Sequence, residues 1–170
     1  MKKWLAAAAG AVLLLSPVVD AEATDAATLK KYQPNKALSY RFAVTGGAVK
    51  SYKLTYKNKA WRASNNMQAV HYTFQNGKLT AVVEADQHIW QLKAPVKVGQ
   101  IVKTTTFDGR TMKTKVISTN KTLRIQAGTF KSVIVVKNMT TGNTFYLAKH
   151  RGIILMKGNG YREELQKVIK

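Results

Sequence analysis

Strict alternation of apolar and polar side chains is the feature that most restricts how this chain can fold. Residues 51–57, SYKLTYK, place tyrosine or leucine at every second position and lysine or threonine between them. Successive side chains of a β-strand point to opposite faces of its sheet. The segment therefore predicts a strand with one buried face and one charged face.

Segments of this kind follow one another at short intervals, separated by turn residues, through most of the chain. The sharpest turn signal is Asn76-Gly77, because both residues tolerate the positive φ angles of a two-residue hairpin turn. Residues 161–170 fit both strand and helix spacing, and we predict a strand there. The predicted strands are residues 37–44, 49–56, 60–64, 69–75, 78–84, 88–93, 102–107, 112–118, 122–126, 129–138, 143–149, 152–157 and 162–168.

Residues 24–33 predict a short helix, in which Asp25 favours the N-terminal end and Pro34 stops the chain from continuing. The predicted fold class is therefore mainly all-β. We expect an antiparallel sheet curved into a sandwich or an open barrel, with the short helix before it. The continuous apolar run at residues 133–136 predicts a strand covered on both faces.

The N-terminal residues predict a secretory signal peptide. Lys2 and Lys3 precede an uncharged apolar run at residues 5–15, and Ala21-Glu22-Ala23 fits a cleavage pattern. Cleavage after Ala21 is the alternative to cleavage after Ala23. The apolar run is shorter than the roughly 20 residues that span a bilayer, which argues against a retained anchor. We therefore expect residues 1–23 to be a signal peptide, and the protein to be secreted, extracellular or cell-wall associated.

Residues 24–170 are expected to form a single β domain, with a seam at residues 94–95, Ala94-Pro95, as the candidate boundary within it. The chain has no cysteine, which excludes disulfides, thiolate metal sites and attachment of a lipid to cysteine.

The net charge is +20, from 28 basic and 8 acidic residues. No acidic residue occurs in residues 26–83 or in residues 109–161, so the charge is spread along the chain. A field of this size attracts polyanions and weakens with salt. We expect an anionic cell-wall polymer or membrane surface as the partner, and no specific nucleic acid. The densest basic set, predicted to bind polyanions, is Lys50, Lys53, Lys57, Lys59 and Arg62.

Five short motifs of the C-terminal half occur in a characteristic order. They are PVKVGQ at residues 95–100, GTFK at 128–131, FYLAK at 145–149, GII at 152–154 followed by Lys157, and a hydrophobic segment at 165–169. In this order they resemble poorly characterised secreted or lipid-anchored proteins of Gram-positive bacteria. The chain departs from that pattern at Ile101-Val102, where tryptophan is favoured, and at residues 150–152, where Gly-Val-Gly is favoured. The resemblance implies an antiparallel sheet or open barrel facing the cell exterior, and it implies no catalytic residue.

One polar cluster could carry chemistry. On a straight strand, Glu84, Asp86 and His88 would share a face and could bind a metal ion or divide acid and base roles. If Asp86 sits at a hairpin tip, the three side chains diverge. Aromatic residues among the lysines, such as Trp61 and Trp90, could stack on bases or sugars, but we expect most of them in the core. We expect no catalytic, cofactor or metal site.

These features lead to a ranked expectation of function. The first is a secreted, strongly basic, non-enzymatic protein that associates electrostatically with the cell envelope. The alternative is an extracytoplasmic carrier of an apolar ligand such as a lipid, which a curved sheet could enclose. An enzyme built on Glu84, Asp86 and His88 comes third. A continuous apolar groove would favour the carrier, and a filled core would count against it.

Overall fold

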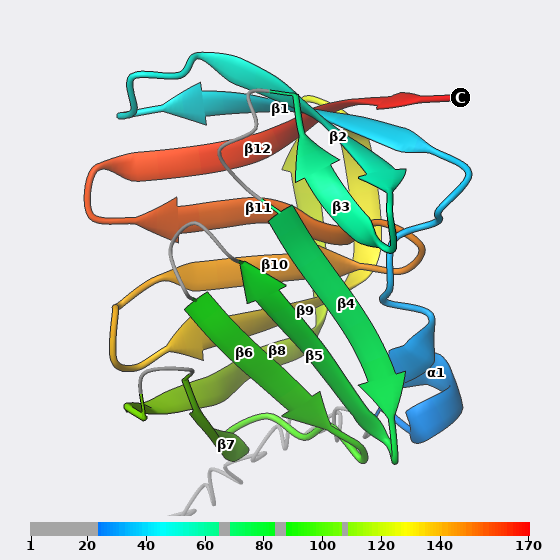
Figure 1. Cartoon of the computed structure of the whole chain (residues 1–170). Helices are drawn as coiled ribbons and strands as arrows, with labels where there is room; N and C mark the ends of the chain where they lie inside the picture. The colour runs from blue at the N-terminus through cyan, green and yellow to red at the C-terminus, as the bar shows by residue number, and fades with distance from the viewer. Residues whose placement is uncertain (1–23, 65–68, 84–87, 107–108) are drawn as a thin grey trace, which may run out of the picture.

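A computed structural model of the chain describes residues 24–64, 69–83, 88–106 and 109–170. They form one antiparallel sheet of twelve strands and one short helix, α1 (Ala26–Lys30) (Figure 1). The mainly all-β prediction is confirmed, and of the two predicted shapes the sheet takes the open barrel. The strands are β1 (Ser39–Thr45), β2 (Ser51–Lys57), β3 (Ala60–Ala63), β4 (Ala69–Gln75), β5 (Lys78–Val83), β6 (His88–Lys93), β7 (Ile101–Thr105), β8 (Thr111–Ile125), β9 (Gly128–Asn138), β10 (Thr144–Ala148), β11 (Gly152–Gly158) and β12 (Tyr161–Ile169).

The strand order is β6-β5-β4-β3-β2-β1-β12-β11-β10-β9-β8-β7, so each half of the chain forms a meander of consecutive strands. The two meanders join where β1 pairs with β12. Strands β6 and β7 form the two ends of the order, although they follow one another in the chain. Residues 94–95, where the sequence suggests a seam, lie in the connection between these two ends, and their peptide bond is cis. In Figure 1 the strands β4 to β6 cross in front of β9 to β12, which closes most of the barrel.

The interior is filled by large aromatic and aliphatic side chains. Trp61 and Trp90 are 2% and 0% exposed. Tyr40 lies 5.3 Å from the ring of Trp61, and Phe145 lies 6.5 Å from the ring of Trp90. Both tryptophans therefore belong to the core, as expected. The run at residues 133–136 is buried along its whole length, which confirms that its strand is covered on both faces.

The long hairpin of β8 and β9 differs from the prediction. Residues 112–118 and 122–126 were expected to be separate strands, but both lie in β8. The polar segment between them forms no turn: register shifts between residues 116 and 123 keep it paired with β9. Ser132 in β9 adopts a φ of +51°, and the hairpin tip reaches β12, where the backbone N–H of Ala127 donates to the carbonyl of Leu165 at 3.2 Å. The hairpin thus forms a second layer over part of the sheet.

Two local predictions are confirmed by backbone geometry. Asn76 and Gly77 both have positive φ, +51° and +69°, in the turn between β4 and β5. The ambiguous C-terminal segment is a strand, β12. In the turn after β1, position 46 has room for glycine alone, because a Cβ there would lie 1.8 Å from the carbonyl oxygen of Gly160 in the neighbouring turn.

The predicted N-terminal helix is present but shorter than expected. Asp25 caps it, and its Oδ1 accepts a hydrogen bond from the backbone N–H of Thr28 at 2.6 Å, which lowers the pKa of the carboxyl group. Leu29 is fully buried and fixes the helix against the sheet. Thr24, the first described residue, pairs with Val96 and is thereby held against the connection between β6 and β7. Residues 1–23, the expected signal peptide, lie outside the described residues. No helix among the described residues is long and apolar enough to cross a membrane.

Candidate functional site

The structure places three of the five predicted polyanion-binding residues, Lys53, Lys57 and Arg62, on the outer face of β2 and β3. Lys53 and Lys57 alternate with the buried Tyr52 and Leu54, so they point away from the core. The remaining members are Lys50 before β2, Lys59 in the following turn, and Arg62 on β3. All five side chains are exposed. We call Lys50, Lys53, Lys57, Lys59 and Arg62 the β2–β3 set.

The sheet register extends this cationic surface onto β1 and β12. Arg41 lies directly opposite Lys53 on one side and directly opposite Lys167 on the other. All three side chains are exposed. Opposite residues of an antiparallel pair have Cα atoms about 4.5–5.5 Å apart, and like charges in such pairs destabilise the sheet. Three cations thus share one line across three strands without an acid between them.

The same arrangement recurs elsewhere on the sheet. In each case two basic residues of neighbouring strands face each other directly, where a mixed sequence would place an acid opposite a base. These further pairs are Lys78 with Lys93, Lys103 with Lys113, Lys115 with Lys137, and Lys157 with Arg162.

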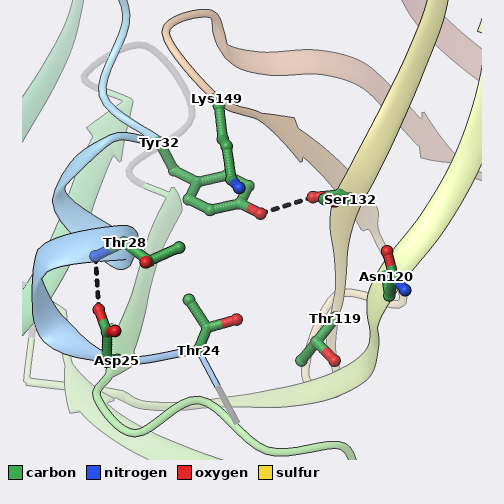
Figure 2. A pocket seen from close by; sticks show the side chains of 8 residues that line it. All are labelled: Thr24, Asp25, Thr28, Tyr32, Thr119, Asn120, Ser132 and Lys149. Atoms are coloured by element: carbon green, nitrogen blue, oxygen red, sulfur yellow. Dashed lines mark hydrogen bonds between the residues drawn. The ribbon is translucent and has the colours of Figure 1, made fainter. Parts of the chain in front are cut away.

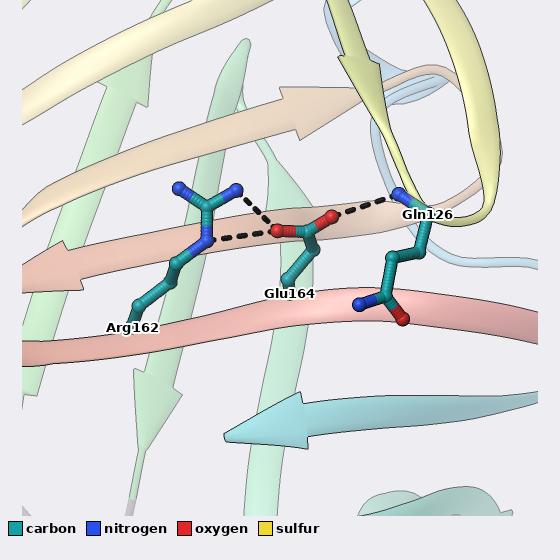
Figure 3. Close-up of polar contacts among 3 residues, drawn as sticks. All are labelled: Gln126, Arg162 and Glu164. Atoms are coloured by element: carbon teal, nitrogen blue, oxygen red, sulfur yellow. Dashed lines mark hydrogen bonds and ion pairs between the residues drawn. The ribbon is translucent and has the colours of Figure 1, made fainter. Parts of the chain in front are cut away.

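Among the described residues, Glu164 has its carboxylate on the outer face of the sheet, and that carboxylate already accepts hydrogen bonds from within the protein. It accepts hydrogen bonds from the backbone N–H of Gln126 at 2.7 Å and from Nε of Arg162 at 2.8 Å, and it pairs with a second guanidinium nitrogen (Figure 3). The third nitrogen of Arg162 points away from the carboxylate in that view. Glu164 is only 8% exposed, because the hairpin tip covers it. It therefore partly offsets the charge of Arg162.

Glu163, its neighbour, faces the interior. Its carboxylate accepts hydrogen bonds from the hydroxyl of Tyr52 at 3.0 Å and from the hydroxyl of Tyr161. Burial raises the pKa of Tyr52 well above its ordinary value, and the nearby carboxylate of Glu163 raises it further. A carboxylate held in this way satisfies buried hydroxyls and contributes nothing to the outer surface.

A polar cavity of about 290 Å³ lies between α1 and the bend of the β8–β9 hairpin (Figure 2). The hydroxyl of Tyr32 donates to the carbonyl of Ser132 at 2.5 Å across one side of it, and burial raises the pKa of Tyr32 to about 12. Lys149 and Asp25 bring the two charged groups of the lining. This lining suits a small polar molecule and does not suit an apolar ligand. The lining residues are Thr24, Asp25, Thr28, Tyr32, Thr119, Asn120, Ser132 and Lys149.

The carrier and enzyme alternatives gain no support from the described geometry. The described interior is filled by buried aromatic and aliphatic side chains, and a second cavity, near Gln75 and Gln91, is also lined by polar residues. Glu84 and Asp86 lie outside the described residues, and of His88 only the backbone pairing with Val83 is described. The described ranges hold no cluster of three residues that could ligate a metal ion.

Sequence reasoning predicted the β2–β3 set but missed the cations that face one another on other strands. Arg41 and Lys167 are far apart in the chain, and only the pairing of β1 with β12 makes them neighbours. The available signal was lysine at alternate positions, as in Lys113 and Lys115, which marks an outward face but gives no cross-strand partner.

Comparison of the chain with protein-family models, with curated proteins and with solved structures found no match. The resemblance to secreted proteins of Gram-positive bacteria therefore stays a prediction, and any function has to be argued from the surface itself.

Proposed function

We propose that this protein is a secreted, non-enzymatic component of the cell envelope that binds anionic cell-wall polymers through the outer face of its sheet. The observation that carries the proposal is the direct opposition of basic residues across neighbouring strands, best seen where Arg41 stands between Lys53 and Lys167. Among the described acids, Asp25 caps a helix, Glu163 faces inward and Glu164 is covered.

A bound polyanion would relieve the repulsion that this register creates. Each anionic group placed between two facing cations replaces one unfavourable contact by two favourable ones, and it releases counterions to the solvent. A linear polymer can make several such contacts along the sheet, and each further contact is intramolecular once the first has formed. The β2–β3 set and Arg41 provide adjacent cations of this kind, and the chemistry needed is binding alone.

The test is binding of the exported protein to isolated cell walls with and without their anionic polymers, over a salt series. If roughly five cations engage the polymer, affinity should fall about a hundredfold between roughly 50 and 200 mM salt. Removal of the polymer should abolish the binding. Binding that survives both high salt and polymer removal would refute the proposal.

A charge-matched pair of variants locates the contact. Lys50→Gln, Lys53→Gln and Lys57→Gln together should lower affinity and flatten the salt dependence. The control variant Lys30→Gln, Lys36→Gln and Lys149→Gln removes the same charge from outside the sheet face. It should change the affinity much less. Equal losses in the two variants would show that net charge acts alone.

A further inference from the structure

Strands β7 to β9 carry an exposed apolar surface that the polymer-binding proposal does not explain. Among the described residues, the large apolar side chains exposed to solvent are Val98 at 53%, Ile101 at 55%, Ile117 at 44% and Met139 at 49%. All four come from one part of the molecule, although they span more than forty positions in the chain. Solitary exposed apolar residues are ordinary, whereas a group set among charges marks an interaction surface.

The register and the backbone hydrogen bonds bring these residues close together. Ile101 on β7 lies directly opposite Lys115 on β8, and Ile117 is two residues further along the same face of β8. The backbone N–H of Gly99 donates to the carbonyl of Val116 at 2.9 Å, which brings the segment with Val98 beside Ile117.

Met139 completes the group on the other side of β8. Its backbone N–H donates to the carbonyl of Lys113 at 2.7 Å, just beyond the end of β9. In Figure 1 these strand segments lie at the lower end of the barrel, away from β2 and β3. We call Val98, Ile101, Ile117 and Met139, with Lys97, Lys103, Lys113, Lys115 and Lys137, the β7–β9 patch.

Lysines alternate with the apolar residues throughout the β7–β9 patch. Lys115 and Lys137 lie in the same line across the strands as Ile101, and Lys103 faces Lys113 in the next line on that face. No acidic residue is described between residues 97 and 142, and the one acid of that segment, Asp108, lies outside the described residues. The patch therefore combines apolar contact area with a local excess of positive charge.

We infer that the β7–β9 patch docks the protein on an anionic lipid surface. Lysine near such a surface gains from the negative potential, and its long apolar stem lets the ammonium group reach the headgroups while neighbouring apolar side chains enter the interface. A wall polymer would satisfy the lysines but would leave the four apolar residues in water. A second copy of the chain would satisfy the apolar residues but would oppose lysines to lysines.

This inference rests on the proposed envelope location but concerns a different surface, so the two can fail separately. The probe is vesicles of phosphatidylglycerol mixed with phosphatidylcholine, compared with vesicles of phosphatidylcholine alone. We expect binding to the anionic vesicles, with a fraction that remains at high salt because apolar side chains are inserted. Wall binding without vesicle binding would overturn the inference and leave the proposed function standing.

Three variants separate the contributions of charge and apolar contact. Ile101→Ser, Ile117→Ser and Met139→Ser together should weaken vesicle binding about tenfold, remove the salt-resistant fraction and leave wall binding unchanged. Lys103→Gln, Lys113→Gln and Lys115→Gln together should weaken vesicle binding about a hundredfold, at about fivefold per lysine. The control, Lys50→Gln, Lys53→Gln and Lys57→Gln, removes the same charge and should cost less than about tenfold.

Two results with these variants would overturn the inference, and sedimentation adds a third. It is overturned if the apolar variant binds vesicles as the unmodified protein does, or if both lysine variants lose equally. It is also overturned if sedimentation shows a dimer that the apolar variant converts to a monomer, because a second copy is then the occupant. All substitutions are at exposed or half-exposed positions, so unchanged thermal unfolding verifies that each variant is folded.

Discussion

The outer faces of β2–β3 and of β7–β9 are both rich in lysine, but they differ in what lies between the lysines. On β2 the residues between them are Ser51 and Thr55, which are exposed and polar. On β7 and β8 they are Ile101 and Ile117. The same sign of charge can therefore serve two ligands. A polar spacer leaves a surface that attracts polyanions and releases them in salt, whereas an apolar spacer adds contact area that salt does not weaken.

The hairpin tip of β8–β9 lies between these two faces. A substitution in the core beneath this tip should have the largest effect on stability. Leu155 is fully buried and lies directly opposite Glu164, on the outward side that the tip covers. Leu155→Ala should lower the free energy of unfolding by about 3 kcal/mol, because it leaves a cavity beneath the tip. Chemical denaturation measures this loss. Ile101→Ala, at an exposed position, should stay within about 0.5 kcal/mol.

Testing each lysine variant with both ligands, the wall polymer and anionic vesicles, shows most directly whether the two faces differ in what they bind. The β2–β3 lysine variant, Lys50→Gln, Lys53→Gln and Lys57→Gln, should lose about tenfold in affinity for the soluble wall polymer. Lys103→Gln, Lys113→Gln and Lys115→Gln should lose clearly less for the polymer. Titration of each variant with the polymer and with anionic vesicles would give opposite rankings. The same ranking for both ligands would mean that the two faces are one continuous electrostatic surface.

Glu164 offers a smaller and more local test, because it offsets a cation at the border between the faces. Glu164→Gln keeps an acceptor for the N–H of Gln126 but removes the charge that holds Arg162. Stability should fall by about 1 kcal/mol, since the pair is partly exposed. Polymer affinity and its salt dependence should rise slightly, as Arg162 becomes available. Unchanged polymer affinity in the folded variant would show that Arg162 is not part of the binding surface.

Most of the fold was readable from the sequence because each strand carries its own alternation and its own turn. Residues 69–75 and 88–93 were predicted with the bounds that the structure has. An exception is residues 119–121, which are polar enough to resemble a turn, yet they lie within β8, where the register shifts. A bulge depends on the partner strand, so a local pattern cannot reveal it.

The candidate site was only half readable, for a related reason. Lysines at alternate positions mark an outward face, and that made the β2–β3 set visible. The sequence does not specify how the strands pair. That pairing decides which lysines face one another, and it places Ile101 and Met139 on either side of the same stretch of β8. The cost or benefit of each charge is a property of the register.

The smallest expected effect concerns Arg41. It compares the two faces by the repulsion between cations that face one another on neighbouring strands. Arg41 meets two opposing cations, Lys53 and Lys167, whereas Lys103 meets one, Lys113. Arg41→Gln should therefore raise the free energy of unfolding by about 0.5 kcal/mol in low salt, and Lys103→Gln by about half as much. Both gains should vanish near roughly 1 M salt, where the screening length is about 3 Å. Thermal unfolding over a salt series measures them. If neither substitution stabilises the protein in low salt, the facing cations avoid one another in solution, and a bound anion has no repulsion to relieve.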